Sequence, residues 1–459
     1  MADTATIAPP RFGLPEPPPE TTVEEYTHRL ERAVQAINRA DLDFLVVYAD
    51  REHAADMAYL CGVDPRFEEA LLVLRSDGAR FLYLGNECQN YGPPPALGIE
   101  VGLYQEFSPQ GQIRDTPVRP EQLLERCGIG PGSRVGTAGG KYFTAGFVTD
   151  VRTAHTLPAF LVDALRAVAG EEHVRNAEEI FLAPDTGLRL TLSAREIVRC
   201  EYAAALTSSS VAAALAGIRP GGYEDDVAGL LIDRGLPHSA HTMVNFGEKA
   251  RRGLSSPSHR RARLGDAYQV AQGLRGALTC RAGAIAHGPR DLGPELAEFF
   301  PALVSNYFDT MATWYETLGL GVTTGEVYAA AESVRDPDVF SFALNPGHFL
   351  HFEEWSHSTF APNDPTVLRS GMVLQGDIIP VSAGPFCTVN IEDGVALADE
   401  RLRAELADDH PETWARIQAR RTFLHEEIGV KLDESVLPLS NIPLWHTPYV
   451  LDPTRVLTR

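Results

Sequence analysis

The stretch SAREIVRCEYAAALTSSSVAAALAGIRPGG, residues 193–222, decides the second half of the fold. It opens with Ser193 and Glu196, the S-x-x-E pattern of a capping box, which satisfies free backbone N–H groups of a first helical turn. It closes with a Pro-Gly-Gly run, and these residues end helices. We therefore predict one long helix over residues 194–217, at the start of a second structural unit that begins near residue 190.

Downstream of this helix, strand-like and helical segments alternate. Strand-like segments recur at 240–246, 266–272 and 371–381, and a long helix is predicted at about 295–318. Strands separated by long helices, with several hairpins between neighbours, indicate an α+β fold.

Upstream of the helix, the chain has the signals of a smaller α/β domain. Residues 42–48 form a short apolar run typical of a buried strand. Ser76-Asp77-Gly78 separates two further strand-like runs and predicts a hairpin. The predicted organisation has four parts: a Pro-rich N-terminal arm (1–24), an α/β N-terminal domain (25–180), a larger α+β domain (185–400), and a helical C-terminal extension with a tail (401–459).

Composition excludes several classes of protein. The 459 residues carry 40 Lys+Arg against 62 Asp+Glu, a net charge of -22, whereas a general nucleic-acid binder needs a basic surface. No apolar run reaches the roughly 18–20 residues that span a bilayer, so we expect no membrane association. The first twenty residues lack the features of a signal peptide, and the six cysteines show no CxxC pairing. We expect reduced thiols and a cytoplasmic location.

The order of short motifs resembles that of the creatinase/prolidase/aminopeptidase P superfamily. The matching motifs, in chain order, are Tyr59-Leu60-Cys61-Gly62, Ser193–Glu196, Ile218-Arg219-Pro220-Gly221, Val244-Asn245-Phe246-Gly247, Leu264-Gly265-Asp266, Gly347-His348, Gly371-Met372-Val373 and Ile391-Glu392-Asp393-Gly394. The resemblance implies a creatinase-like N-terminal domain, a C-terminal domain of the pita-bread fold, and a homodimer.

Metallopeptidases of this superfamily hold two metal ions with two Asp, one His and two Glu. The corresponding positions here are Ala271, Cys280, His348, Asp377 and Glu392. Alanine cannot bind a metal, and a thiolate suits softer ions than Mn²⁺. We therefore predict no metal cofactor. A single Zn²⁺ held by the remaining four side chains stays open as an alternative.

Creatinase, in the same superfamily, also lacks the two aspartates and acts on a guanidino C–N bond without metal. The position of its catalytic histidine falls here near Ser255, so that chemistry does not transfer directly. We predict a small-molecule hydrolase or lyase that acts on a C–N bond of a carboxylate-bearing substrate. His348 would be the base, and Asp377 and Glu392 would orient it or bind a cationic group. Cys280 is either a nucleophile or a small core residue.

Two other functions remain open at this stage. One is a non-catalytic pita-bread module that binds a peptide or protein. The other is a metal-dependent aminopeptidase of the Xaa-Pro type, which Ala271 disfavours.

Candidate substrate-binding residues lie in three places. His351 and His357 follow His348 closely. The basic segment, residues 249–263, has no acid between Glu248 and Asp266 and is either a carboxylate clamp or a solvated loop; its candidate ligands are Arg251, Arg252 and Arg260. Dimers of this superfamily often share a first-domain residue with the neighbouring site, and Arg66 is the candidate here, unless it belongs to an ordinary surface loop.

Overall fold

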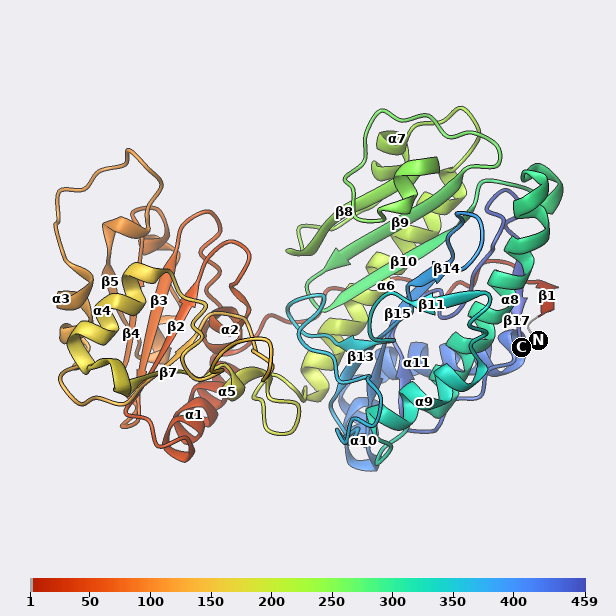
Figure 1. Cartoon of the computed structure of the whole chain (residues 1–459). Coiled ribbons are helices and arrows are strands. Elements are labelled where there is room, and N and C mark those ends of the chain that lie inside the picture. Colours follow the sequence, from red (N-terminus) through yellow and green to blue (C-terminus); the bar gives the residue numbers. More distant parts are fainter. Residues whose placement is uncertain (1–2) are drawn as a thin grey trace. The chain divides into compact units, whose positions relative to one another are not determined.

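The computed structural model describes residues 3–459 and divides them into two units (Figure 1). The N-terminal unit is Pro19–Arg189. The C-terminal unit is Leu190–Arg459, together with the segment that ends at Pro18. Within the C-terminal unit, β1 (Asp3–Thr6) pairs with β17 (Arg455–Thr458), so the two ends of the chain meet in a small antiparallel sheet.

The N-terminal unit is built on a mixed six-stranded sheet in the order β5-β4-β3-β2-β6-β7. All six residues of the central strand β2 are buried, as its apolar run predicts. The predicted hairpin joins β3 and β4, and Gly78 at its tip has a φ of 95°, which glycine adopts without strain. The strands and helices are β2 (Phe44–Ala49), β3 (Ala70–Arg75), β4 (Arg80–Leu84), β5 (Glu100–Leu103), β6 (Val135–Ala138), β7 (Val174–Asn176), α1 (Val23–Arg39), α2 (Ala55–Cys61), α3 (Pro120–Arg126), α4 (Ala159–Ala169) and α5 (Glu179–Leu182).

The C-terminal unit is built on an antiparallel sheet in the order β12-β13-β15-β10-β9-β8, with β16 paired to β15. Its strands are β8 (His238–Phe246), β9 (Ala267–Leu274), β10 (Ala277–Ala284), β12 (His348–Phe349), β13 (Val373–Asp377), β15 (Asn390–Leu397) and β16 (Val436–Pro438). Its helices are α6 (Ala194–Gly217), α7 (Glu224–Ala228), α8 (Pro294–Thr317), α9 (Thr324–Val334), α10 (Glu400–Asp409) and α11 (Pro411–Phe423).

Helix α6 has the predicted bounds, and both halves of its capping box are formed by Ser193 and Glu196. It packs against β9 and β10, and Thr207 on the helix hydrogen-bonds Thr279 on β10 at 3.0 Å. Helix α8 buries Tyr307 near β15, where the Tyr307 hydroxyl accepts a hydrogen bond from the Ile391 N–H at 2.9 Å. Cys280 on β10 lies opposite Glu392 on β15, so the preceding residues, Thr279 and Ile391, both point to the other face of the sheet. Helices α6 and α8 contact these two residues and therefore cover the same face.

One predicted strand is interrupted. The sequence predicts a continuous strand over 371–381, but β13 ends at Asp377, and β14 (Pro380–Ser382) pairs with β11 (Phe340–Phe342) in a separate sheet. Proline has no N–H to donate to a ladder, so Pro380 is suited to the start of a strand rather than its interior. Because of this break, Asp377 is the last residue of β13.

Between residues 3 and 459, no helix combines the length and apolar character that crossing a membrane requires.

Candidate functional site

Hydrogen-bond register brings four of the superfamily's ligand positions into one row. Ala271 on β9 lies opposite Cys280 on β10, Cys280 lies opposite Glu392 on β15, and Glu392 lies opposite Asp377 on β13. Residues that face each other across antiparallel strands point to the same side of the sheet. The row therefore lies on the face opposite to the one that α6 covers.

This row forms part of the floor of a cavity of about 660 Å³. Next to the row, the amide side chains of Gln269 and Asn390 also line it. The Nδ2 of Asn245 donates to the Oε1 of Gln269 at 2.7 Å, which fixes the orientation of the Gln269 amide. The floor is therefore polar but carries few formal charges beyond those of its carboxyl groups.

His348 lies on β12, at the edge of the sheet, and is completely buried. Its Nδ1 is 3.2 Å from the carbonyl oxygen of Phe349, which can only accept, so Nδ1 carries the proton. Its Nε2 lies 3.6 Å from Glu354 Oε1 and 3.8 Å from Glu392 Oε1, and in the neutral imidazole this nitrogen would carry the lone pair. Trp355 stacks on the imidazole with ring centroids 4.2 Å apart and holds the plane of the ring.

The carboxyl groups around His348 retain protons to unusually high pH. Burial, and next the negative charge of Glu392, raise the pKa of Asp377 to about 8. Burial and the neighbouring Glu354 raise the pKa of Glu392 well above its usual range. Burial also raises the pKa of Glu354, while His348 opposes that shift. At neutral pH the Asp377 carboxyl is mainly protonated and can donate a proton to a ligand.

Several polar atoms in this cluster have no hydrogen-bond partner within the described chain. They are His348 Nε2, Asp377 Oδ1, Asn390 Oδ1 and Glu392 Oε1. Buried polar atoms without partners are rare in folded proteins, and they are typical of sites that bind a ligand. This cluster and the cavity above it form the candidate active site.

Comparison with known proteins finds similarity to solved structures, and at this level of sequence identity the similarity shows the fold alone. No family model and no curated protein matches the sequence. Among solved structures, a prolidase from Pyrococcus horikoshii OT3 matches with a TM-score of 0.61 at 16% identity, over 81% of this chain and 95% of that one. Dipeptidase PepE from Mycobacterium ulcerans matches with a TM-score of 0.60 at 20% identity, over 83% and 95%.

A variant of Escherichia coli aminopeptidase P matches with a TM-score of 0.56 at 17% identity, over 88% of this chain and all of the other. The chain has the pita-bread fold. The fold that the sequence motifs imply is therefore confirmed.

The superfamily's two-metal site does not fit this pita-bread domain. Ala271 contributes a methyl group where a carboxylate would bridge two ions, and the pKa of the Cys280 thiol is raised well above its usual value, chiefly by burial. Hard divalent ions need oxygen ligands, so the two positions together cannot support a second ion.

A different set of side chains is arranged for at most one ion. Within residues 3–459, His348, Glu354 and Glu392 form the single group whose ligand atoms all lie within 4.8 Å of one another. The four-residue zinc set predicted from the sequence is corrected in two respects: Cys280 and Asp377 are not in this group, and Glu354 is.

Glu354 is the site residue that sequence reasoning missed. It follows His348 by six positions, and the chain reverses between them, because the Phe349 N–H donates to the His357 carbonyl at 2.7 Å. The sequence does offer one signal: the two acids Glu353 and Glu354 follow the candidate residue His351 within two and three positions. Motif transfer from the superfamily does not mark this position.

Cys280 has the environment of a core residue. It is 5% exposed and packs with Met243, Ala271 and Leu278. The guanidinium of the neighbouring Arg281 pairs with Asp393 at 2.7 Å on the opposite face of the sheet and donates to the backbone carbonyl of Cys280 at 2.8 Å. The two largest influences on the thiol, burial and the charge of Glu392, raise its pKa and outweigh Gln269 and Arg281, which lower it. The net rise of the thiol pKa disfavours a nucleophilic thiolate, and the core alternative describes the contacts better.

The two histidines that follow His348 lie in other surroundings. His351 is buried, and its Nε2 is 4.0 Å from Glu196 Oε1 at the start of α6. The backbone carbonyl of His357 pairs with Phe349, and burial lowers the pKa of the His357 imidazole. The lining of the large cavity is formed by other residues, with His241 as its histidine.

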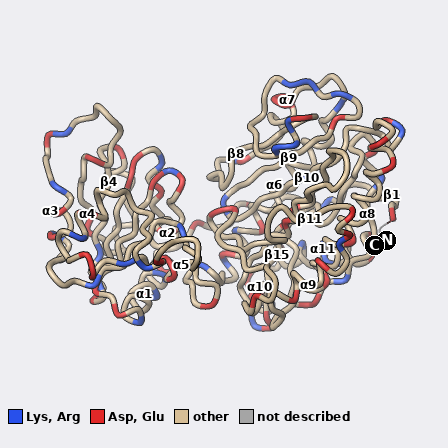
Figure 2. The backbone as a smooth tube through the Cα atoms, viewed as in Figure 1, with Lys and Arg blue, Asp and Glu red and all other residues tan. Residues whose placement is uncertain are grey.

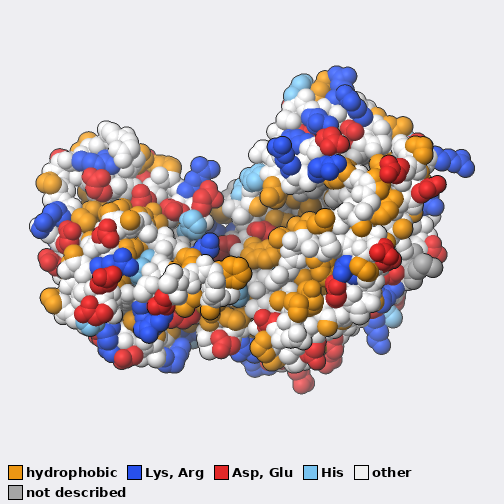
Figure 3. All heavy atoms as spheres, in the orientation of Figure 1, with side chains coloured by type: hydrophobic (Ala, Val, Ile, Leu, Met, Phe, Trp, Pro, Cys, Tyr) orange, Lys and Arg blue, Asp and Glu red, His pale blue; other side chains and the backbone are white. Residues whose placement is uncertain are grey.

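The basic segment is divided between two cavities. Figures 2 and 3 show Lys and Arg gathered around α7 and the loop before β9. Arg251 and Arg252 line the large cavity, and Arg251 lies 4.2 Å from the ring centroid of Phe386. Arg260 instead lines a second cavity. The prediction that these three arginines form one clamp is therefore corrected: Arg251 and Arg252 line the large cavity, and Arg260 lines the second.

Arg66 lies in the N-terminal unit with a φ of 61°. Its backbone N–H donates to the Asp64 carboxylate at 3.1 Å, and its guanidinium lies 6.0 Å from the Tyr91 ring centroid. These contacts define a structured turn on that unit. A contribution from Arg66 to a neighbouring copy stays a prediction.

Proposed function

We propose that this chain hydrolyses a C–N bond of a small substrate in the cavity above the sheet, without a pair of metal ions. The observation that carries the proposal is the buried Nε2 of His348, which lies 3.6 Å from Glu354 and 3.8 Å from Glu392, two acids that line the cavity of about 660 Å³. The names of the structural neighbours, prolidase, dipeptidase and aminopeptidase P, support cleavage of C–N bonds.

The chemistry assigns two roles. His348 Nε2 removes a proton from a water molecule as the water oxygen attacks the electrophilic carbon. The neutral Asp377 carboxyl gives a proton to the nitrogen as the C–N bond breaks, and the proton held by His348 then restores Asp377. The balance is one water consumed, one C–O bond formed and one C–N bond broken. Asp377 suits the acid role because its pKa of about 8 keeps it protonated at neutral pH.

The substrate is proposed to carry a carboxylate. Arg251 and Arg252 line the cavity at residues 250–254, away from the acidic cluster. Arginine binds a carboxylate with two parallel hydrogen bonds. A substrate that reaches from the carboxyl cluster to these arginines would present its C–N bond to His348.

The test combines metal removal with a substrate panel. Chelator-treated protein is incubated with Xaa-Pro dipeptides and with guanidino and ureido acids, and released amines are measured by mass spectrometry. We expect turnover that survives chelation and falls roughly 10²- to 10⁴-fold in His348→Ala. Turnover that requires two bound ions per chain would overturn the proposal. Saturable binding without turnover of any panel member would also overturn it, and would favour a non-catalytic module.

A further inference from the structure

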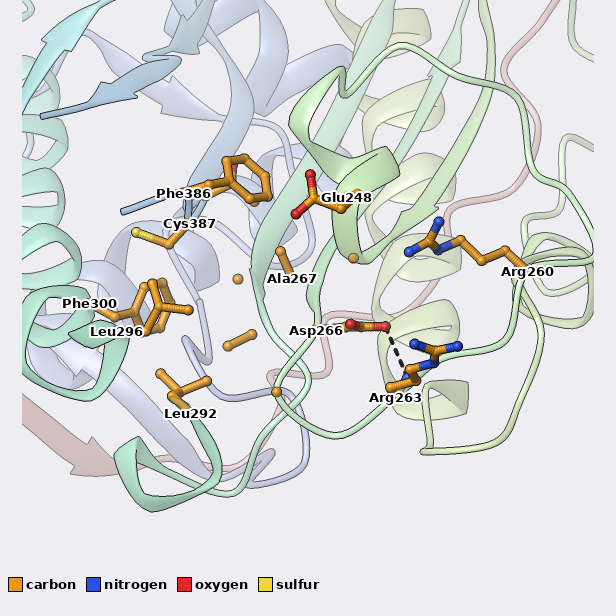
Figure 4. Close-up of a pocket in the computed structure, with 15 residues that line it drawn as sticks. Glu248, Arg260, Arg263, Asp266, Ala267, Leu292, Leu296, Phe300, Phe386 and Cys387 are labelled. Carbon is orange, nitrogen blue, oxygen red and sulfur yellow. Dashed lines mark hydrogen bonds between the residues drawn. The ribbon is translucent and has the colours of Figure 1, made fainter. Parts of the chain in front are cut away.

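A second cavity lies on the other side of the 386–388 segment from the reaction cavity. Its volume is about 240 Å³, which is below the roughly 300–1,000 Å³ of sites for drug-sized ligands. Figure 4 shows two contrasting sides: Leu292, Leu296 and Phe300 on one, and Arg260, Arg263 and Asp266 on the other. The occupant must therefore be small, with an apolar end and a polar end.

The apolar side is part of a rigid wall. Leu292 precedes α8, and Leu296 and Phe300 lie on its first turns. Phe300 is 1% exposed and packs edge-to-face with Tyr449, with ring centroids 5.6 Å apart. A wall of this kind offers an apolar group a fixed surface, and burying apolar area against it favours binding.

The polar side has an excess of positive charge. Within the described chain, neither Arg260 nor Arg263 has an ion-pair partner, and Arg260 Nε is buried without a hydrogen bond. Of the two acids that line the cavity, Glu248 pairs with Arg251 at 3.4 Å. Asp266 accepts a hydrogen bond from the Arg263 backbone N–H at 3.1 Å. Two guanidinium groups thus face one available carboxylate.

Gly247 allows Arg260 to occupy this position. Its φ is 56°, and a Cβ atom there would lie 2.7 Å from Arg260 Nη2 and 3.0 Å from Asp266 Oδ1. The guanidinium therefore lies directly against the backbone of residue 247. A side chain at this position would push the cation out of the cavity.

We propose that this second cavity binds a small organic carboxylate with an apolar body. The carboxylate accepts hydrogen bonds from Arg260 and Arg263, and the apolar body packs on Leu296 and Phe300. Phe386, Cys387 and Thr388 line both cavities, so the occupant contacts the wall of the reaction cavity without entering it. The site does not depend on the reaction proposed above, and its test measures binding alone.

The probe is 3-phenylpropionate, titrated calorimetrically into the full chain, with 3-phenylpropanamide as the uncharged control. We expect saturable binding of the acid at millimolar concentration and at least tenfold weaker binding of the amide. Arg260→Gln should weaken binding of the acid by roughly tenfold to a hundredfold, since a charged hydrogen bond is lost. Arg263→Gln, at an exposed position, provides a second variant that keeps the packing around Gly247.

Arg252→Gln is the matched control, because it removes an arginine of the same basic segment that lines the other cavity. Its affinity for 3-phenylpropionate should equal that of the unmodified chain. Loss of binding in Arg252→Gln alone would place the carboxylate in the reaction cavity and overturn the proposal. So would the absence of saturable binding, or equal binding of the acid and the amide.

Discussion

Replacing Asp377 with asparagine should change how the stability of the C-terminal unit depends on pH. The pKa of the Asp377 carboxyl is about 8 in the folded chain, against 3.8 for an ordinary aspartic acid. Between these two values, the folded chain keeps a proton that the unfolded chain has released. The native state binds more protons there, so its stability falls as pH rises through this window.

The magnitude follows from the size of the shift. One pKa unit corresponds to about 1.4 kcal/mol, and the shift is about four units. The cost of burying Asp377 therefore grows by about 1.4 kcal/mol per pH unit between pH 5 and 8. It levels off above pH 8, at roughly 6 kcal/mol. Asparagine has no charge to desolvate. The free energy of unfolding of Asp377→Asn, relative to that of the native chain, should therefore rise by about 1.4 kcal/mol per pH unit between pH 5 and 8.

Urea unfolding at pH 5 to 9, followed by tryptophan fluorescence, measures this difference. All four tryptophans lie after residue 310, so the signal reports the C-terminal unit alone. Asp338→Asn is the control, since Asp338 is exposed and its replacement should give a difference that is constant with pH. A difference between Asp377→Asn and the native chain that stays flat, or falls, from pH 5 to 8 would refute the assigned proton.

Three further outcomes are expected. Metal analysis after dialysis against Zn²⁺ or Mn²⁺ should give at most one ion per chain, and any bound ion should be lost in Glu354→Gln; two ions would contradict the argument from Ala271. Iodoacetamide at pH 8 should modify Cys280 more slowly than free cysteine, because burial raises the pKa of its thiol, and mass spectrometry of the labelled peptide gives the rate. Arg281→Met should destabilise the C-terminal unit by about 3–5 kcal/mol in urea, because Asp393 is left buried without its partner; a loss below 1 kcal/mol would show that the pair is dispensable.

Local signals were sufficient for α6 and for the β3–β4 hairpin, but not for the strand predicted over 371–381. The capping box and the breakers bound α6 because they act within one or two turns of a helix. The resemblance to the superfamily's motifs located Ala271, Cys280, Asp377 and Glu392, which the sheet register then aligns in one row. The misfit with a two-metal site is visible from residue identity alone, since a methyl group cannot bind an ion.

Other features depend on contacts between distant segments. Glu354 reaches His348 through a chain reversal, and no helical or strand period encodes that contact. The direction of Arg281, away from Cys280, follows from the alternation of β10 and from the position of Asp393 on β15. The basic segment is divided between two cavities because its residues pack beside different strands and helices of the folded unit.

The sequence by itself determined the bounds of α6 and the lack of a metal-binding group at Ala271, because these depend on residue type and local spacing, and its resemblance to the superfamily implied the pita-bread architecture. Only the tertiary structure decided which carboxyl groups surround His348, which of them keep a proton, and which arginines face which cavity. Those properties depend on burial and on the approach of side chains from separate strands and loops, and neither exists until the chain is folded.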